Sequence, residues 1–133
     1  MIKIKRVDHV GIAVKDTVEA LPFYRLLDLQ VTATEDLSAR GLKIAFLPAG
    51  ECKVELLEPT KPDSTVGKFI EKRGEGIHHI AFAVEDIDGA VKELQAAGIE
   101  MIDQAPRPGG GGHRVAFIHP SSAHGVLVEL VGE

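Results

Sequence analysis

The chain has a single cysteine and no long apolar run, and each of these shortages excludes a class of protein. Its one cysteine, Cys52, rules out an intramolecular disulfide and fits a reducing compartment. No apolar stretch approaches the roughly 18 residues of a membrane span. The first residues indicate a strand rather than a signal peptide, so we expect a soluble, cytoplasmic protein without a membrane partner.

Positive charge is also in short supply. The chain carries 15 lysine and arginine residues against 20 aspartate and glutamate residues, a net charge of −5. This balance argues against a nucleic-acid-binding surface. The length of 133 residues and the 44% hydrophobic content suit one compact globular domain, residues 1–133.

What the chain does contain is an internal repeat. Residues Asp8–Asp16 (DHVGIAVKD) return as His78–Asp86 (HHIAFAVED), and Lys53–Leu57 (KVELL) returns as Leu127–Val131 (LVELV). Each copy carries one histidine and one glutamate at matching positions, and together they supply His9, Glu55, His79 and Glu129.

The pattern of apolar and turn residues predicts the same order of elements in both copies. The first copy, residues 1–58, is expected to contain strands Ile4–Val14, Gln30–Glu35, Gly41–Leu47 and Cys52–Glu58 and a helix between Asp16 and Asp28. The second, residues 77–133, is expected to contain strands Ile77–Val84, Ile99–Ile102, Arg114–Ile118 and Val126–Val131 and a helix over Ile87–Ala97. Each copy is therefore a βαβββ module. The connector, residues 59–76, is expected to hold a short helix over Val66–Arg73, and Pro106–Gly112 to be the most flexible segment.

Strand alternation predicts which side chains share a face. Each repeated histidine shares its face of the strand with small residues, and the bulky residues of the same strand lie on the opposite face. The small residues are Gly11, Ala13, Ala81 and Ala83. The same rule favours His79 over His78, because His78 falls on the bulky face. Glu55 and Glu129 interrupt apolar strands, where a carboxylate is costly unless it is paired or binds a metal.

Two imidazoles and two carboxylates suit a divalent ion such as Mn²⁺, Co²⁺, Ni²⁺ or Zn²⁺. The two carboxylates would neutralise the ion, and six-coordination would leave two positions for adjacent substrate oxygens. Any one of these residues taken alone is more often a core histidine or an edge charge. Their joint recurrence favours a metal site formed by His9, Glu55, His79 and Glu129. The histidines that have no repeat partner are expected to be surface residues, with the pocket mouth as the alternative place for the first of them: His113, His119 and His124.

The duplicated module and its ligand pattern resemble the vicinal-oxygen-chelate superfamily, and within it the methylmalonyl-CoA epimerase family. Several segments carry the resemblance: Asp8–Val14, Val54–Pro59, Asp63–Ile70, Gly74–Phe82, Arg114–Pro120 and Gly125–Leu130. The resemblance implies an α+β fold, with a curved eight-stranded mixed sheet around the metal and helices on the convex face. It also implies a homodimer. The four repeated residues fall on the metal positions of the family, where some epimerases have glutamine in place of Glu55.

The activity implied by the resemblance is epimerisation of methylmalonyl-CoA. A base would remove the α-proton, chelation would stabilise the enolate, and an acid would return the proton to the other face. The alternatives are a glyoxalase-I-like lyase that acts on a glutathione hemithioacetal, and a non-catalytic small-molecule-binding protein of the same fold. The retained ligand set counts against the non-catalytic alternative.

Glu129, beside the metal, is our first choice for one proton carrier, and the resemblance also implies it. For the other, some family members have a glutamate where this chain has Ile44, and Lys43 has the wrong strand parity to replace it. Glu55, a metal-bound water or the movement of a single base remain open. Candidates to contact the CoA phosphates are Lys61, Lys68, Lys72, Arg73, Arg107 and Arg114.

Overall fold

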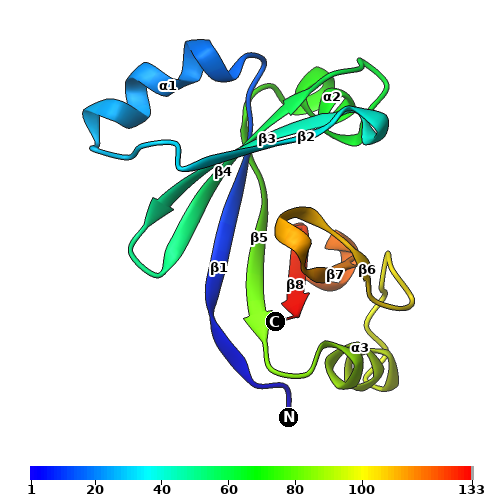
Figure 1. Cartoon of the computed structure of the whole chain (residues 1–133). Helices are drawn as coiled ribbons and strands as arrows, with labels where there is room; N and C mark the ends of the chain where they lie inside the picture. Colours follow the sequence, from blue (N-terminus) through cyan, green and yellow to red (C-terminus); the bar gives the residue numbers. More distant parts are fainter. Residues whose placement is uncertain (133) are drawn as a thin grey trace. The chain divides into compact units, whose positions relative to one another are not determined.

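The computed structural model describes residues 1–132, and its elements follow the predicted order closely (Figure 1). Three α-helices are present in this part of the chain: α1 (Thr17–Leu26), α2 (Thr65–Arg73) and α3 (Ile87–Ala96). Eight strands accompany them: β1 (Ile4–Ala13), β2 (Ala33–Leu37), β3 (Leu42–Ala49), β4 (Cys52–Pro59), β5 (Gly76–Val84), β6 (Arg107–Pro108), β7 (Arg114–Ile118) and β8 (Val128–Gly132). They are hydrogen-bonded in the order β2-β3-β4-β1-β5-β8-β7-β6, with parallel and antiparallel pairs, which confirms the predicted α+β class and mixed eight-stranded sheet. No helix in residues 1–132 is long and apolar enough to cross a bilayer.

The chain forms two compact units that do not coincide with the sequence repeats. One unit comprises residues 1–9 and the chain from residue 79 onward, and the other comprises residues 10–78. The boundary therefore cuts β1 between His9 and Val10 and β5 between His78 and His79. As a result, the start of the first repeat folds with the second repeat, and both repeated histidines belong to the same unit.

The unit of residues 10–78 contains two helices with side-chain caps at their N-termini. The Asp16 carboxylate accepts a hydrogen bond from Val18 N at 2.9 Å and caps the N-terminus of α1. The Ser64 hydroxyl accepts one from Gly67 N at 3.1 Å and caps the N-terminus of α2. Strands β2, β3 and β4 form antiparallel pairs in this unit. Its buried apolar residues include Ala13, Leu47, Leu56 and Leu57.

The unit formed by residues 1–9 and the chain from residue 79 onward is organised around β8. This strand pairs in parallel with β5, where Glu129 lies opposite Ala81, and antiparallel with β7, where Glu129 lies opposite Phe117. The Asp86 carboxylate accepts from Gly89 N at 3.0 Å and begins α3. Helix α3 and the strands bury a common apolar core that includes Val84, Val91 and Leu130.

One predicted strand of the unit that contains β8 was wrong. The predicted strand Ile99–Ile102 forms only an isolated bridge between Met101 and Ile118. The bridge does not extend into a strand, because the backbone N–H groups of Ile102 and Asp103 both donate to Phe117 O. The backbone N–H of Phe117 donates to the Asp103 carboxylate at 2.8 Å instead of to a strand partner. The short strand β6 lies instead within the segment predicted to be most flexible, where Gly111 adopts a positive φ of 69°.

Candidate metal centre

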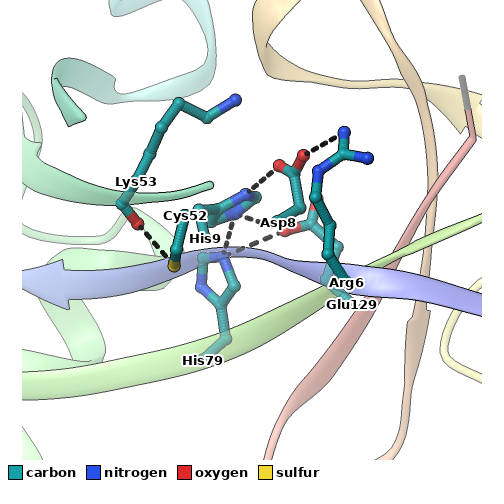
Figure 2. Close-up of polar contacts among 7 residues, drawn as sticks. All are labelled: Arg6, Asp8, His9, Cys52, Lys53, His79 and Glu129. Carbon is teal, nitrogen blue, oxygen red and sulfur yellow. Dashed lines mark hydrogen bonds and ion pairs between the residues drawn. The ribbon is translucent and has the colours of Figure 1, made fainter. Parts of the chain in front are cut away.

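Three of the four predicted ligands lie together in the unit that contains β8. His9 comes from β1, His79 from β5 and Glu129 from β8, and their exposed fractions are 5%, 5% and 6%. His9 Nε2 lies 3.0 Å from His79 Nε2, and Glu129 Oε1 lies 2.9 Å from the first nitrogen and 3.0 Å from the second. Figure 2 shows the three side chains pointing toward one another, and the three atoms form a triangle. We call them the donor triangle.

The strand register explains how the triangle forms. Laterally paired residues of a sheet point to the same face, so Glu129 shares a face with Ala81 and Phe117. His79 precedes Ala81 by two residues on β5 and therefore points the same way. Ala81 is fully buried and contributes only a methyl group, so it leaves room beside the carboxylate. Ala81 also packs with Val115 and Val131, and that the small residues clear this face stays a prediction.

Asp8 holds the outer nitrogen of the His9 ring. Asp8 Oδ2 lies 2.8 Å from His9 Nδ1, and because a carboxylate oxygen only accepts, the hydrogen belongs to Nδ1. In the neutral imidazole this tautomer leaves a lone pair on Nε2, the nitrogen inside the donor triangle. The geometry therefore prepares His9 Nε2 to bind a cation.

The triangle requires a positive charge. A lone pair on a nitrogen and a carboxylate oxygen repel at 2.9 Å unless a proton or a metal ion lies between them. Burial alone would raise the pKa of Glu129, but hydrogen bonds from His79 and His9, together with their positive charges when protonated, lower it from 4.5 to about 2. Glu129 is therefore a permanent anion near neutral pH.

The dimensions and chemistry of the triangle fit a divalent ion. With ligand bonds of about 2.1 Å, two ligands at right angles lie about 3.0 Å apart, whereas tetrahedral ligands lie about 3.4 Å apart. The observed edges of 2.9 to 3.0 Å match one face of an octahedron. Two imidazole nitrogens and a carboxylate oxygen also suit the ions expected from the sequence. His9, His79 and Glu129 are thus suited to hold one of them.

The fourth predicted ligand, Glu55, lies on β4 in the other unit. Its exposed fraction is 6%, which is low for a carboxylate, and its register partner on β3 is Phe46. Its part in a metal site stays a prediction from the repeat. Asp8, by contrast, was not among the predicted site residues. A signal was available, since Asp8 is the point where the first repeat carries a carboxylate beside its histidine and the second carries His78.

The predicted CoA contacts divide between the units. Arg107 Nε donates to Asp103 Oδ1 at 2.9 Å, and its guanidinium lies 5.5 Å from the centroid of Phe117, whose ring in turn lies edge-on to His79 with centroids 5.5 Å apart. Arg114 makes a bidentate pair with Asp88 at 2.8 and 2.9 Å and joins β7 to α3. The other four belong to the unit of residues 10–78: Lys61, Lys68, Lys72 and Arg73. Arg107 is thus connected to a predicted ligand through a single ring.

Comparison with known proteins places this chain in a family. A model of the glyoxalase/bleomycin resistance protein/dioxygenase superfamily matches residues 8–117. An ethylmalonyl-CoA/methylmalonyl-CoA epimerase of Cereibacter sphaeroides is 39% identical over 96% of this chain and 97% of its own length. The chain belongs to the methylmalonyl-CoA epimerase family of this superfamily.

Further methylmalonyl-CoA epimerases are also similar to this chain. The human mitochondrial methylmalonyl-CoA epimerase is 38% identical, and the alignment covers 94% of this chain and 72% of that protein. A solved structure of methylmalonyl-CoA epimerase in complex with methylmalonyl-CoA and NH4+ is 39% identical, with a TM-score of 0.92 over 98% of this chain and 96% of that one. The resemblance inferred from the sequence, and with it the isomerase class, is confirmed at the level of the family.

Proposed function

We propose that this protein interconverts (R)- and (S)-methylmalonyl-CoA by removing and returning the α-proton. The observation that carries the proposal is the buried donor triangle of His9, His79 and Glu129, in a chain of the epimerase family. A non-catalytic binding protein of this fold has no need for three buried donor atoms that face one another, because such an arrangement is costly unless a proton or a metal ion lies between them. The retained triangle therefore favours catalysis.

The substrate explains why a cation is needed. The chiral carbon lies between a thioester and a carboxylate, and the negative carboxylate opposes formation of a second negative charge beside it. A divalent ion held by His9, His79, Glu129 and, as we further propose, Glu55 would act as a Lewis acid for the thioester and carboxylate oxygens. Burial of the donors excludes water and strengthens this electrostatic effect.

Glu129 is proposed as one of the proton carriers as well as a ligand. Both of its contacts with the histidines use Oε1, and we assign the proton transfer to the other oxygen, Oε2, which lies outside the donor triangle. Inversion also needs a carrier on the opposite face. Ile44 cannot supply it, because it is a buried apolar residue that packs with Ala13, Leu57 and Val66. Glu55, a water at the metal or a single moving base remain the candidates.

Deuterium exchange tests the proposal directly. Metal-loaded protein incubated with methylmalonyl-CoA in D₂O should place deuterium at the α-position and interconvert the two epimers, which mass spectrometry and chiral analysis detect. Chelator treatment should stop the exchange, and re-addition of Co²⁺ or Mn²⁺ should restore it. Fully metallated protein that catalyses no exchange would refute the proposal.

A glyoxalase-I-like lyase is the second candidate, because the matching superfamily includes glyoxalases and the same proton chemistry would serve. Formation of S-lactoylglutathione from methylglyoxal and glutathione would identify that activity. We further propose a homodimer, which light scattering after size-exclusion chromatography tests; a monomeric mass would exclude it.

A further inference from the structure

The two histidines of the donor triangle are supported in different ways. His9 Nδ1 contacts the Asp8 carboxylate, and the opposite oxygen of that carboxylate, Oδ1, lies 3.6 Å from Arg6 Nη2. The ring of His79 packs edge-on against Phe117. At the position of Asp8 the second repeat has His78, whose ring packs against Phe69 with centroids 5.0 Å apart. The duplication has thus kept the ligands and changed what supports them.

The position of the Asp8 carboxylate is unusual for a strand. Neighbouring residues of a strand normally point to opposite faces, so Asp8 would be expected to point away from His9. Its Oδ2 nevertheless lies 2.8 Å from His9 Nδ1, and its exposed fraction is only 6%. A buried carboxylate is costly without compensation, and here the compensation comes from the His9 ring and from Arg6. Figure 2 shows Asp8 between these two side chains.

We propose that Asp8 is a positioning residue that fixes the tautomer of His9 and increases the affinity of the site for its divalent ion. This inference rests on the proposed function, since it assigns His9 Nε2 as a metal ligand. By accepting the Nδ1 hydrogen, Asp8 leaves the Nε2 lone pair inside the donor triangle and prevents rotation of the ring. Its negative charge also makes the imidazole a stronger donor. Arg6, 3.6 Å from the other carboxylate oxygen, helps to hold Asp8 in place.

Cobalt(II) binding tests the role of Asp8 without an activity assay. Competition with a chromophoric chelator should give an affinity about 10- to 100-fold lower for Asp8→Asn than for the parent protein, because the amide keeps the size but loses the charge. Asp8→Ala should lose at least as much, and Asp8→Glu should recover part of the loss. The visible bands of bound Co²⁺ should also shift in Asp8→Asn, which a general loss of stability would not cause.

Asp88→Asn is the matched control. Asp88 is also a carboxylate paired with an arginine in the same unit, Arg114, but it is exposed and lies outside the donor triangle. The affinity and spectrum of Co²⁺ should be unchanged in this variant. Parent-like Co²⁺ binding by folded Asp8→Asn and Asp8→Ala would overturn the inference.

A measurement on the parent chain covers the case in which the Asp8 variants do not fold. In Zn²⁺-loaded protein labelled with ¹⁵N-histidine, NMR should find His9 protonated at Nδ1 and metal-bound at Nε2. A His9 ring protonated at Nε2 would overturn the inference whatever the variants do. A parent protein that binds neither Co²⁺ nor Zn²⁺ would refute the proposed metal site itself, so the two failures are distinguishable.

Discussion

Replacement of Glu129 by glutamine tests the ligand and the proton carrier in one change. The substitution preserves shape but removes the charge that the histidines stabilise. The pKa of Glu129 is lowered from 4.5 to about 2 against the effect of burial. A lowering of this size corresponds to a net preference of about 3 kcal/mol for the ionised form of Glu129 in the metal-free protein. A bound metal ion would interact with the same negative charge of Glu129. Because glutamine lacks that charge, the variant should bind Co²⁺ much more weakly.

The expected kinetic effect of Glu129→Gln is larger than the loss of metal alone. Removal of a positioned proton carrier typically costs a factor of about 10² to 10⁴. The rate of deuterium exchange into methylmalonyl-CoA should therefore fall by at least this factor, even at Co²⁺ concentrations that saturate the variant. Equilibrium dialysis would establish that occupancy. Near-normal exchange would refute Glu129 both as a proton carrier and as an essential ligand.

Glu55→Gln provides the comparison for this experiment. It makes the same chemical change at the repeat-related position, and an amide oxygen can still coordinate a metal. We expect it to retain most of the Co²⁺ affinity and measurable exchange. If both variants lost exchange equally at full occupancy, the specific assignment of the proton carrier to Glu129 would be wrong.

Three further predictions address the metal and the charge of the site. The double variant His9→Ala, His79→Ala should bind no Co²⁺ in a dialysis assay while its circular dichroism stays that of a folded protein; retained binding would overturn the ligand assignment. In the metal-free protein the lowered pKa of Glu129 contributes stability that is present above pH 4.5 and is lost as the pH falls from 4.5 to about 2. Urea unfolding should show this loss, and Glu129→Gln should lose less stability over the same range; equal losses would contradict the charge argument. Chelation should also lower the melting temperature measured near pH 7, since an ion that binds only the folded state stabilises it; an unchanged melting temperature would count against a metal bound in the folded protein.

The local pattern of the sequence was sufficient to predict most of the elements. Strand β5 differs from the predicted range by a single residue at its start, and β7 and the start of α3 lie where they were predicted. These elements are specified by alternation, capping aspartates and glycine stops, all of which act over a few residues. The segment after Gly98 was predicted wrongly, because its backbone partners are set by Asp103 and Phe117. That pairing depends on contacts between distant residues, which local pattern does not encode.

The repeat by itself was sufficient to select the residues that we predict to be ligands. Period-two alternation placed His9 and His79 on faces with small residues, and the recurrence of one histidine and one glutamate distinguished them from ordinary core residues. Only the tertiary structure showed that His9, His79 and Glu129 converge to 3.0 Å or less, because convergence depends on the register of β5 with β8. Only the tertiary structure also revealed Asp8, since strand alternation predicts that it points away from His9. The physical reason is the same in both cases: alternation fixes the face of a residue, whereas distances between side chains depend on strand pairing and backbone twist.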